Sequence, residues 1–291
     1  ATLRAVDATD LQLPGSGGLN LHALEWSRDG VPMLLLHGFG NEAHIWDDFA
    51  PVVAPYYRTV ALDHRGHGRS DWAGEAGYEM DAFVDDVEAV TEALGMERMV
   101  LVAHSLGGRV ATLFSGLHPE RVAGLVLVDI GPEVDARGSM RIRQDAEAKV
   151  APVYASVEAY ARDLSLAYPA AQPEALQRMA RHGLRARDDG RFELVMDPDL
   201  RTGVGWRGRD DEDAELALQQ RMWDALAALP CPTLVVRGAA SDILSPEIAD
   251  RMVDEVLQQG RLAVVPQAGH SVMTDNPQGF NDAVAEFALS D

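Results

Sequence analysis

Short apolar runs alternate along the chain with segments of helical periodicity. The runs are too continuously apolar for strands with one face in water, and this is typical of parallel strands covered on both faces. Helical segments, such as the one that places Phe83, Val87 and Val90 on one face, lie between them. Strands are predicted at 31–38, 58–64, 98–104, 122–130, 232–238 and 261–266. This alternation predicts an α/β fold with a doubly wound, mostly parallel sheet.

Two late helices carry clear start signals. Ser245-Pro246-Glu247 has the order of an N-cap, a proline in the first helical position and an acid in the first turn. Asn276-Pro277 repeats the first two of these signals. We therefore expect a helix to follow each of the strands at 232–238 and 261–266.

The strand signal nearly vanishes between residues 131 and 230. Helices are expected to begin near Ser156 and Pro173, and another is expected to end near Leu229. One turn signal, Asp189-Gly190, precedes the short strand-like run "RFELVM". We interpret 131–230 as a helical cap, or lid, inserted into a core domain formed by 1–130 and 231–291.

The net charge of the chain disfavours some classes of binding partner. With 46 acidic and 25 basic residues, the net charge is −21, and partners that need a cationic surface, namely nucleic acid and anionic membranes, are disfavoured. No apolar run approaches the roughly 18 residues of a membrane span, and the first residues show no signal-peptide pattern. The single cysteine, Cys231, excludes an internal disulfide. A cytoplasmic protein acting on a small molecule is expected, with no particular oligomeric state indicated.

The candidate functional residues lie where predicted strands end. Ser105 follows the strand at 98–104, Asp129 closes the one at 122–130, and Asp242 and His270 come after the last two. The carboxyl ends of parallel strands meet at one edge of an open α/β sheet, so these side chains are expected to lie near one another.

Five motifs at these positions resemble those of the α/β-hydrolase superfamily, in its serine esterase or lactonase branch with a helical lid. "HGFG" (37–40) resembles the oxyanion loop, "DHRGHGRSD" (63–71) the glycine-rich turn, and "AHSLGG" (103–108) the nucleophile elbow. "RGAASDILSP" (237–246) resembles the segment with the catalytic acid, and "AGHSVMTDNP" (268–277) the one with the histidine. Their order, serine, acid, histidine, is that of the superfamily.

The chemistry of these residue types fits acyl transfer. A serine hydroxyl becomes a useful nucleophile when a base takes its proton, and His270 is the candidate base for Ser105. Asp242 is favoured as the acid that orients His270, because "SD" after "RGA" matches the usual segment, and Asp129 is the alternative. The backbone N–H groups of Phe39 and Leu106 are expected to bind the oxyanion.

The elbow departs from the pattern G-x-S-x-G at one position. Ala103 stands where the first glycine belongs, while Gly107 keeps the second. Because Ala103 ends a strand, where φ is ordinary and negative, we expect its methyl group to be tolerated.

Other polar residues are weaker candidates for a functional role. His37 is expected chiefly to support its loop, with a substrate contact as the minority interpretation, and Arg141, Arg143 and Arg207 are candidates for binding a substrate carboxylate. His64 and His67 are interpreted as structural parts of the glycine-rich turn, because a third metal ligand is not evident there. Neither a metal nor a cofactor is expected.

The resemblance implies a serine hydrolase that cleaves an ester or lactone of a small organic substrate. The same residues could serve a carbon–carbon bond hydrolase acting on a keto-dienoate, an enol-lactonase, an amidase or a cofactor-free haloperoxidase. Branches with an aspartate nucleophile are disfavoured because residue 105 is serine. A ligand receptor on the same scaffold is the alternative outside the enzymes.

Overall fold

The computed structural model describes residues 7–74, 77–138, 140–141, 152–201 and 212–290. Its central sheet has the strand order β1-β2-β4-β3-β5-β6-β10-β11. From β4 onward in this order neighbouring strands are parallel, whereas β1 and β2 pair antiparallel with their neighbours. The strands are β1 (Thr9–Pro14), β2 (Asn20–Glu25), β3 (Val31–Leu36), β4 (Tyr57–Leu62), β5 (Met99–His104), β6 (Val122–Val128), β10 (Thr233–Gly238) and β11 (Gly260–Val265).

The predicted α/β fold with a mostly parallel sheet is confirmed, and all six predicted strands are present. The β1–β2 pair was not predicted. β2 is almost wholly buried, yet it carries His22 and Glu25, whose polarity interrupts the apolar signal of the strand. Both side chains are paired, His22 with Asp63 and Glu25 with Arg58, which is how a buried strand tolerates them.

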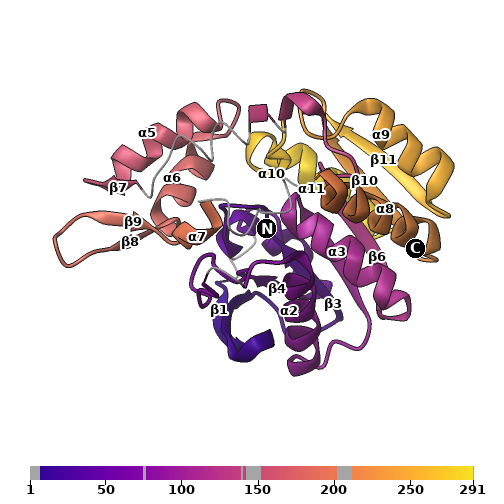
Figure 1. Cartoon of the computed structure of the whole chain (residues 1–291), viewed down its shortest axis with the longest axis horizontal. Helices are drawn as coiled ribbons and strands as arrows, with labels where there is room; N and C mark the ends of the chain where they lie inside the picture. The colour runs from indigo at the N-terminus through magenta and orange to yellow at the C-terminus, as the bar shows by residue number, and fades with distance from the viewer. Residues whose placement is uncertain (1–6, 75–76, 139, 142–151, 202–211, 291) are drawn as a thin grey trace.

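Helices cover both faces of the sheet (Figure 1). Alternate residues of the strands point to opposite faces, so Leu34 and Leu36 belong to one apolar cluster and Met33 and Leu35 to the other. The first cluster includes α2 (Met80–Ala93), α3 (Leu106–Leu117) and α8 (Glu212–Ala228), and the second includes α1 (Ala50–Val53) and α11 (Pro277–Ala288). The shorter elements are η1 (Ser16–Gly18), η2 (Ala43–Trp46), η3 (Pro119–Arg121), α9 (Pro246–Asp250), the π-helical η5 (Arg251–Val256) and α10 (Val272–Asp275).

The predicted helix starts are found in the structure. Ser245 Oγ accepts a hydrogen bond from Ile248 N at 3.2 Å, and Asn276 Oδ1 accepts one from Gly279 N at 2.9 Å. Both caps satisfy backbone donors that the first turn of a helix leaves unpaired. They fix where α9 and α11 leave the edge of the sheet.

Residues 152–201, between β6 and β10, form a group of elements beside the central sheet (Figure 1). A small sheet in the order β7-β9-β8 lies there with two helices that begin where expected, after Ser156 and at Pro173. These elements are β7 (Val153–Tyr154), α5 (Val157–Ala167), α6 (Pro173–His182), β8 (Leu184–Ala186), β9 (Phe192–Leu194) and α7 (Pro198–Arg201).

The last helix of this insertion, α8, packs along α3 rather than with the small sheet. A Cβ on Gly116 of α3 would lie 2.6 Å from the Cβ of Ala225, so the two helices approach closely enough to require glycine there. Met222 and Leu226 of α8 are buried in the cluster that contains α3. The carboxyl end of this segment is therefore anchored against α3, the helix that follows Ser105.

Among the helices that the structure describes, none has both the length and the apolar sequence needed to cross a bilayer.

Candidate active site

Ser105 occupies a sharp turn between β5 and α3. Its φ is +51° and its ψ is −114°, a conformation that non-glycine residues rarely adopt and that marks stored backbone strain. The turn brings α3 against the end of β3: a Cβ on Gly107 would lie 2.5 Å from the carbonyl oxygen of Leu36 and 2.7 Å from that of His37. Glycine is therefore required at residue 107, because any side chain there would clash with backbone atoms that cannot move aside.

Ala103 lies in β5 before the turn, paired with Leu36 and Leu127 of the neighbouring strands. Ala103 is fully buried, and it is not one of the described residues with a positive φ. An extended, buried strand position accommodates a methyl group, as expected from the sequence.

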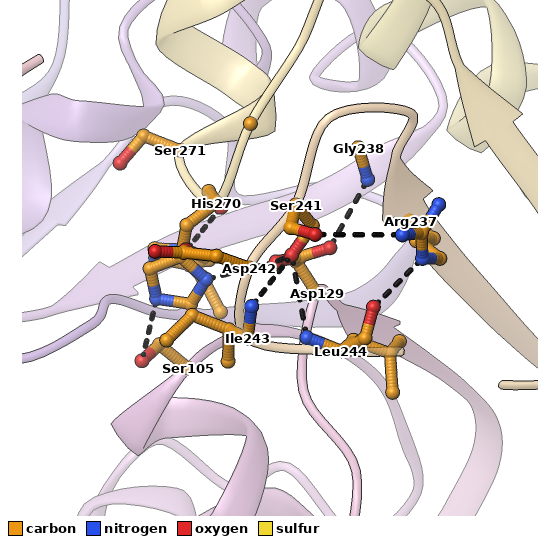
Figure 2. Close-up of polar contacts among 12 residues, drawn as sticks. Ser105, Asp129, Arg237, Gly238, Ser241, Asp242, Ile243, Leu244, His270 and Ser271 are labelled. Carbon is orange, nitrogen blue, oxygen red and sulfur yellow. Dashed lines mark hydrogen bonds and ion pairs between the residues drawn. The ribbon is translucent and has the colours of Figure 1, made fainter. Parts of the chain in front are cut away.

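Ser105, His270 and Asp129 form a continuous hydrogen-bonded array (Figure 2). His270 Nε2 lies 3.1 Å from Ser105 Oγ, and His270 Nδ1 lies 2.9 Å from Asp129 Oδ2. The three residues follow β5, β11 and β6, so the edge of the sheet brings them together as the sequence suggested.

The acid in this array is Asp129 and not Asp242, which corrects the preferred sequence interpretation. Both oxygens of Asp242 are taken by the guanidinium of Arg141, with distances of 2.7 Å to Nε and 2.8 Å to Nη2. The hydrogen bonds from Arg141 lower the pKa of Asp242. The carboxylate is also one-third exposed (32%), whereas Asp129 has no exposed surface.

Asp129 is held by donors on the loop that follows β10. The backbone N–H of Gly238 donates to Oδ1 at 3.0 Å, and the hydroxyl of Ser241 donates to Oδ2 at 2.5 Å (Figure 2). Ser241 Oγ in turn accepts from the backbone N–H groups of Ile243 and Leu244. A buried carboxylate needs such donors to remain charged, and here they also fix its direction toward His270.

The segment that carries Ser241 is fixed by Arg237, which sequence reasoning did not single out. Its Nε donates to the carbonyl of Leu244 at 2.7 Å, and its Nη2 donates to the carbonyl of Ser241 at 3.4 Å. The motif "RGAASD" thus supports the acid through Ser241, one residue before the aspartate that the pattern favoured.

His104 is a further residue that the sequence analysis missed, although it directly precedes Ser105. Its Nε2 donates to the backbone carbonyl of His270 at 2.9 Å, and the two rings lie 4.7 Å apart. Burial, and next the neighbouring His270, hold the pKa of His104 well below its usual value. His104 is therefore a neutral support beneath the His270 loop.

A cavity of about 900 Å³ opens over Ser105 and His270. Phe39 and Leu106 line it, as do Tyr154, Tyr160 and other residues of the insertion. The loop that carries Phe39 packs on the elbow, since a Cβ on Gly38 would lie 2.7 Å from Nδ1 of His104 and 3.1 Å from the Cβ of Ser105.

The charged residues that line the cavity occur mainly in pairs. Arg109 of α3 donates to Glu215 of α8 at 2.9 Å, and Arg141 is bound to Asp242. Of the described lining residues, two are arginines and four are acids, namely Asp163, Glu215, Asp242 and Asp275.

The remaining predicted site residues lie outside the cavity lining or outside the described residues. His37 is fully buried outside the lining of this cavity: its Nε2 accepts from the backbone N–H of His64 at 3.0 Å, and its Nδ1 donates to the carbonyl of Gly38 at 2.7 Å. These contacts agree with the loop-supporting role rather than with a substrate contact. Arg143 and Arg207 lie outside the described residues.

The glycine-rich turn is organised around the carboxylate of Asp63. This carboxylate accepts from Ala43 N, Arg69 N and the ring of His22. Gly68, with a φ of +56°, passes so close that a Cβ there would lie 2.2 Å from Asp63 Oδ2. The spacing of Asp63 and Gly68 in "DHRGHG" is therefore explained by the packing of this turn.

Residues 31–277 match the profile of a family described as the alpha/beta hydrolase fold, and the chain belongs to that family. It is 27% identical over 260 residues to 2-(acetamidomethylene)succinate hydrolase of Mesorhizobium japonicum, with 89% of this chain and 88% of the relative covered. An esterase of Mycobacterium tuberculosis is 26% identical over 269 residues, with 91% and 85% covered. The crystal structure of an alpha/beta hydrolase from Novosphingobium aromaticivorans superposes with a TM-score of 0.82 at 28% identity, covering 98% of this chain and 99% of that one. These relatives support a hydrolase.

Proposed function

We propose that the protein is a serine hydrolase that cleaves an ester or lactone of a small, uncharged organic substrate through an acyl-enzyme. The observation that carries the proposal is the array from Ser105 Oγ through the His270 ring to the buried carboxylate of Asp129. Nucleophile, base and orienting acid stand in hydrogen-bond order, which is the arrangement that acyl transfer by serine requires.

In the proposed reaction, Ser105 Oγ attacks the substrate carbonyl while its proton passes to His270 Nε2. Asp129 keeps the Nδ1 proton of His270 in place and stabilises the imidazolium that forms. The backbone N–H groups of Phe39 and Leu106 are the proposed donors to the oxyanion, and one such donor contributes about 2.7–4 kcal/mol to lowering the barrier. His270 then protonates the leaving alcohol, and a water activated by the same ring releases the acyl group.

An uncharged substrate is favoured by the lining of the cavity. Arg109 and Arg141 both face acids of the protein, and the described lining has two acids more than arginines. A substrate carboxylate would have to compete with Glu215 or Asp242 for its partner, and it would meet repulsion from the other acids. The proposal therefore differs in substrate charge from the succinate named for the Mesorhizobium relative.

We further propose that the insertion between β6 and β10 acts as a lid that selects the substrate. Support comes from its contribution to the cavity lining, which includes Tyr154, Tyr160 and Leu164. No cofactor takes part in the proposed reaction.

The test is hydrolysis of p-nitrophenyl butyrate, with the anionic p-nitrophenyl monosuccinate in parallel. Ser105→Ala should lower kcat by about 10³-fold or more, while Ser165→Ala, an exposed serine of α5, should leave it unchanged. A fast-quenched reaction of the unaltered protein should show the butyryl mass on the peptide containing Ser105. Undiminished turnover by Ser105→Ala, or an acyl group on another residue, would refute the nucleophile. A higher kcat/KM for the monosuccinate would refute the preference for an uncharged substrate.

A further inference from the structure

A second cavity of about 530 Å³ shares no described lining residue with the first. It lies where η2 meets the carboxyl end of α6, and its lining is rich in groups that bind cations. Among its described lining residues the acids, Asp7, Asp10, Glu42, Asp47 and Asp63, outnumber the one arginine, Arg69. Three histidines also face it, His22, His44 and His182.

His44, Asp47 and His182 come together at one end of this cavity. One ligand atom of each residue lies within 4.8 Å of those of the other two. The rings of His44 and His182 are stacked, with centroids 3.6 Å apart and planes inclined by 17°. His44 Nδ1 lies 3.0 Å from Asp47 Oδ2. All three side chains are partly exposed, so an ion in solution has access to them.

The backbone around these residues is held on both sides. Glu42 caps η2 by accepting from the backbone N–H of His44 at 2.8 Å. Arg178, one turn before His182 on α6, donates to Asp48 at 2.5 Å and lies 3.9 Å from Asp47. The arginine therefore fastens α6 to the segment after η2 mainly through Asp48. Its longer approach to Asp47 is to Oδ2, while Asp47 Oδ1 lies 3.2 Å from Nδ1 of His44.

We propose that His44, Asp47 and His182 bind a divalent transition-metal ion of the zinc class, and that this ion joins α6 to η2. Two imidazoles and one carboxylate form a donor set that suits Zn²⁺ and its neighbours, whereas Mg²⁺ and Ca²⁺ prefer oxygen ligands alone. The open positions are available to water.

The geometry needs only a local adjustment. Zinc–ligand bonds of about 2.0–2.1 Å place tetrahedral ligands about 3.3 Å apart, and the His44–Asp47 separation of 3.0 Å is already close to this. His182 has to move closer to the pair, and the two stacked rings have to splay so that both lone pairs meet one ion. Both changes are side-chain rotations at partly exposed positions.

The site is separate from the proposed catalytic array and links two segments far apart in the chain. η2 belongs to the segment between β3 and β4, and α6 belongs to the insertion between β6 and β10. An ion held by both would stabilise the contact between the insertion and the sheet domain. No spacing in the sequence indicates such a site, because folding alone brings His182 to His44.

The experiment is a titration of the EDTA-treated, desalted full chain with ZnCl₂ against a chromophoric chelator, together with thermal unfolding with and without ZnCl₂. His182→Ala and His44→Ala alter ligands on two different elements. His118→Ala removes a histidine whose side chain is as exposed as that of His44 (25%) but which faces Glu88 on another part of the surface. Far-UV circular dichroism confirms that each variant is folded.

Saturable binding of one Zn²⁺ per chain is expected, with the affinity lowered about tenfold or more by either ligand substitution and unchanged by His118→Ala. The rise in Tm on adding ZnCl₂ should be lost in both ligand variants, because only a folded site gains stability from the ion. Equal affinity in His182→Ala and the unaltered chain, or the absence of saturable binding, would overturn the proposal.

Discussion

The carboxylate of Asp129 lies 2.9 Å from Nδ1 of His270, and it is the buried acid that the histidine contacts. Asp242, the aspartate of the expected motif "RGAASDILSP", is bound to Arg141 instead. The two aspartates thus differ in partner, in exposure and in the consequence expected when each is changed.

Asp129→Asn should lower kcat for p-nitrophenyl butyrate by about 10⁴-fold, because an amide at this position favours the wrong tautomer of His270. Asp242→Asn is the matched control, and it should change kcat by less than about tenfold, because an exposed ion pair contributes little. Initial rates at saturating substrate check both values. A larger loss in Asp242→Asn than in Asp129→Asn would return the acid to Asp242.

Ser241→Ala should destabilise the fold as well as the array. Its hydroxyl donates to the fully buried carboxylate of Asp129, and a hydrogen bond to a charged group contributes about 1.5–3 kcal/mol. The free energy of unfolding from urea denaturation at pH 7 should fall by that amount. Ser165→Ala removes a hydroxyl bound to an exposed carbonyl and should stay within about 0.5 kcal/mol. Equal effects of the two substitutions would contradict the support assigned to Ser241.

On the acid side, the pH dependence of activity should be set by a single histidine. Protonated His270 cannot accept the proton of Ser105, so activity should fall toward acid pH. His104 lies against it, but burial keeps the pKa of His104 well below its usual value, and that ring stays neutral over the same range. A plot of log kcat/KM against pH should therefore have a limiting slope of about 1 on the acid side. A slope near 2 would show that both rings titrate.

Gly107→Ala should destabilise the elbow by about 1–3 kcal/mol, since the new Cβ would meet the carbonyl oxygens of Leu36 and His37. Ala103→Gly is the reciprocal change, which restores the glycine of the usual pattern. It should cost about 1 kcal/mol of stability, because glycine in a strand loses more backbone entropy, and it should retain activity. Chemical denaturation and ester hydrolysis measure the two effects. An active, fully stable Gly107→Ala would contradict the close packing of the elbow.

The strands, helix caps and strand-end residues could be predicted because each depends on neighbours in the sequence. Doubly covered strands are apolar, as in β3 and in β5 up to its last residue, His104. The caps at Ser245 and Asn276 act within three residues. β2 escaped prediction because the partners that allow His22 to be buried, Asp10 and Asp63, lie on other segments.

The choice between Asp129 and Asp242 could not be made from the sequence for a similar reason. Both follow strands that end at the same edge of the sheet, and only the direction of each loop decides which carboxylate reaches His270. Asp129, with a φ of +52°, turns sharply at the end of β6, whereas Asp242 lies four residues beyond β10. Loop direction and the partner Arg141 are tertiary properties that apolar periodicity does not carry.

The residues of the proposed array and the insertion residues that line the same cavity come from different stretches of the chain. Ser105, Asp129 and His270 each follow a strand of the central sheet, while Tyr154 and Tyr160 belong to the insertion. Under the proposed function, reactivity and substrate selectivity therefore depend on separate segments of the chain. A chimaera that exchanges residues 152–170 with those of a related hydrolase is expected to change which acyl groups the protein accepts. The positions of Ser105, Asp129 and His270 should stay the same.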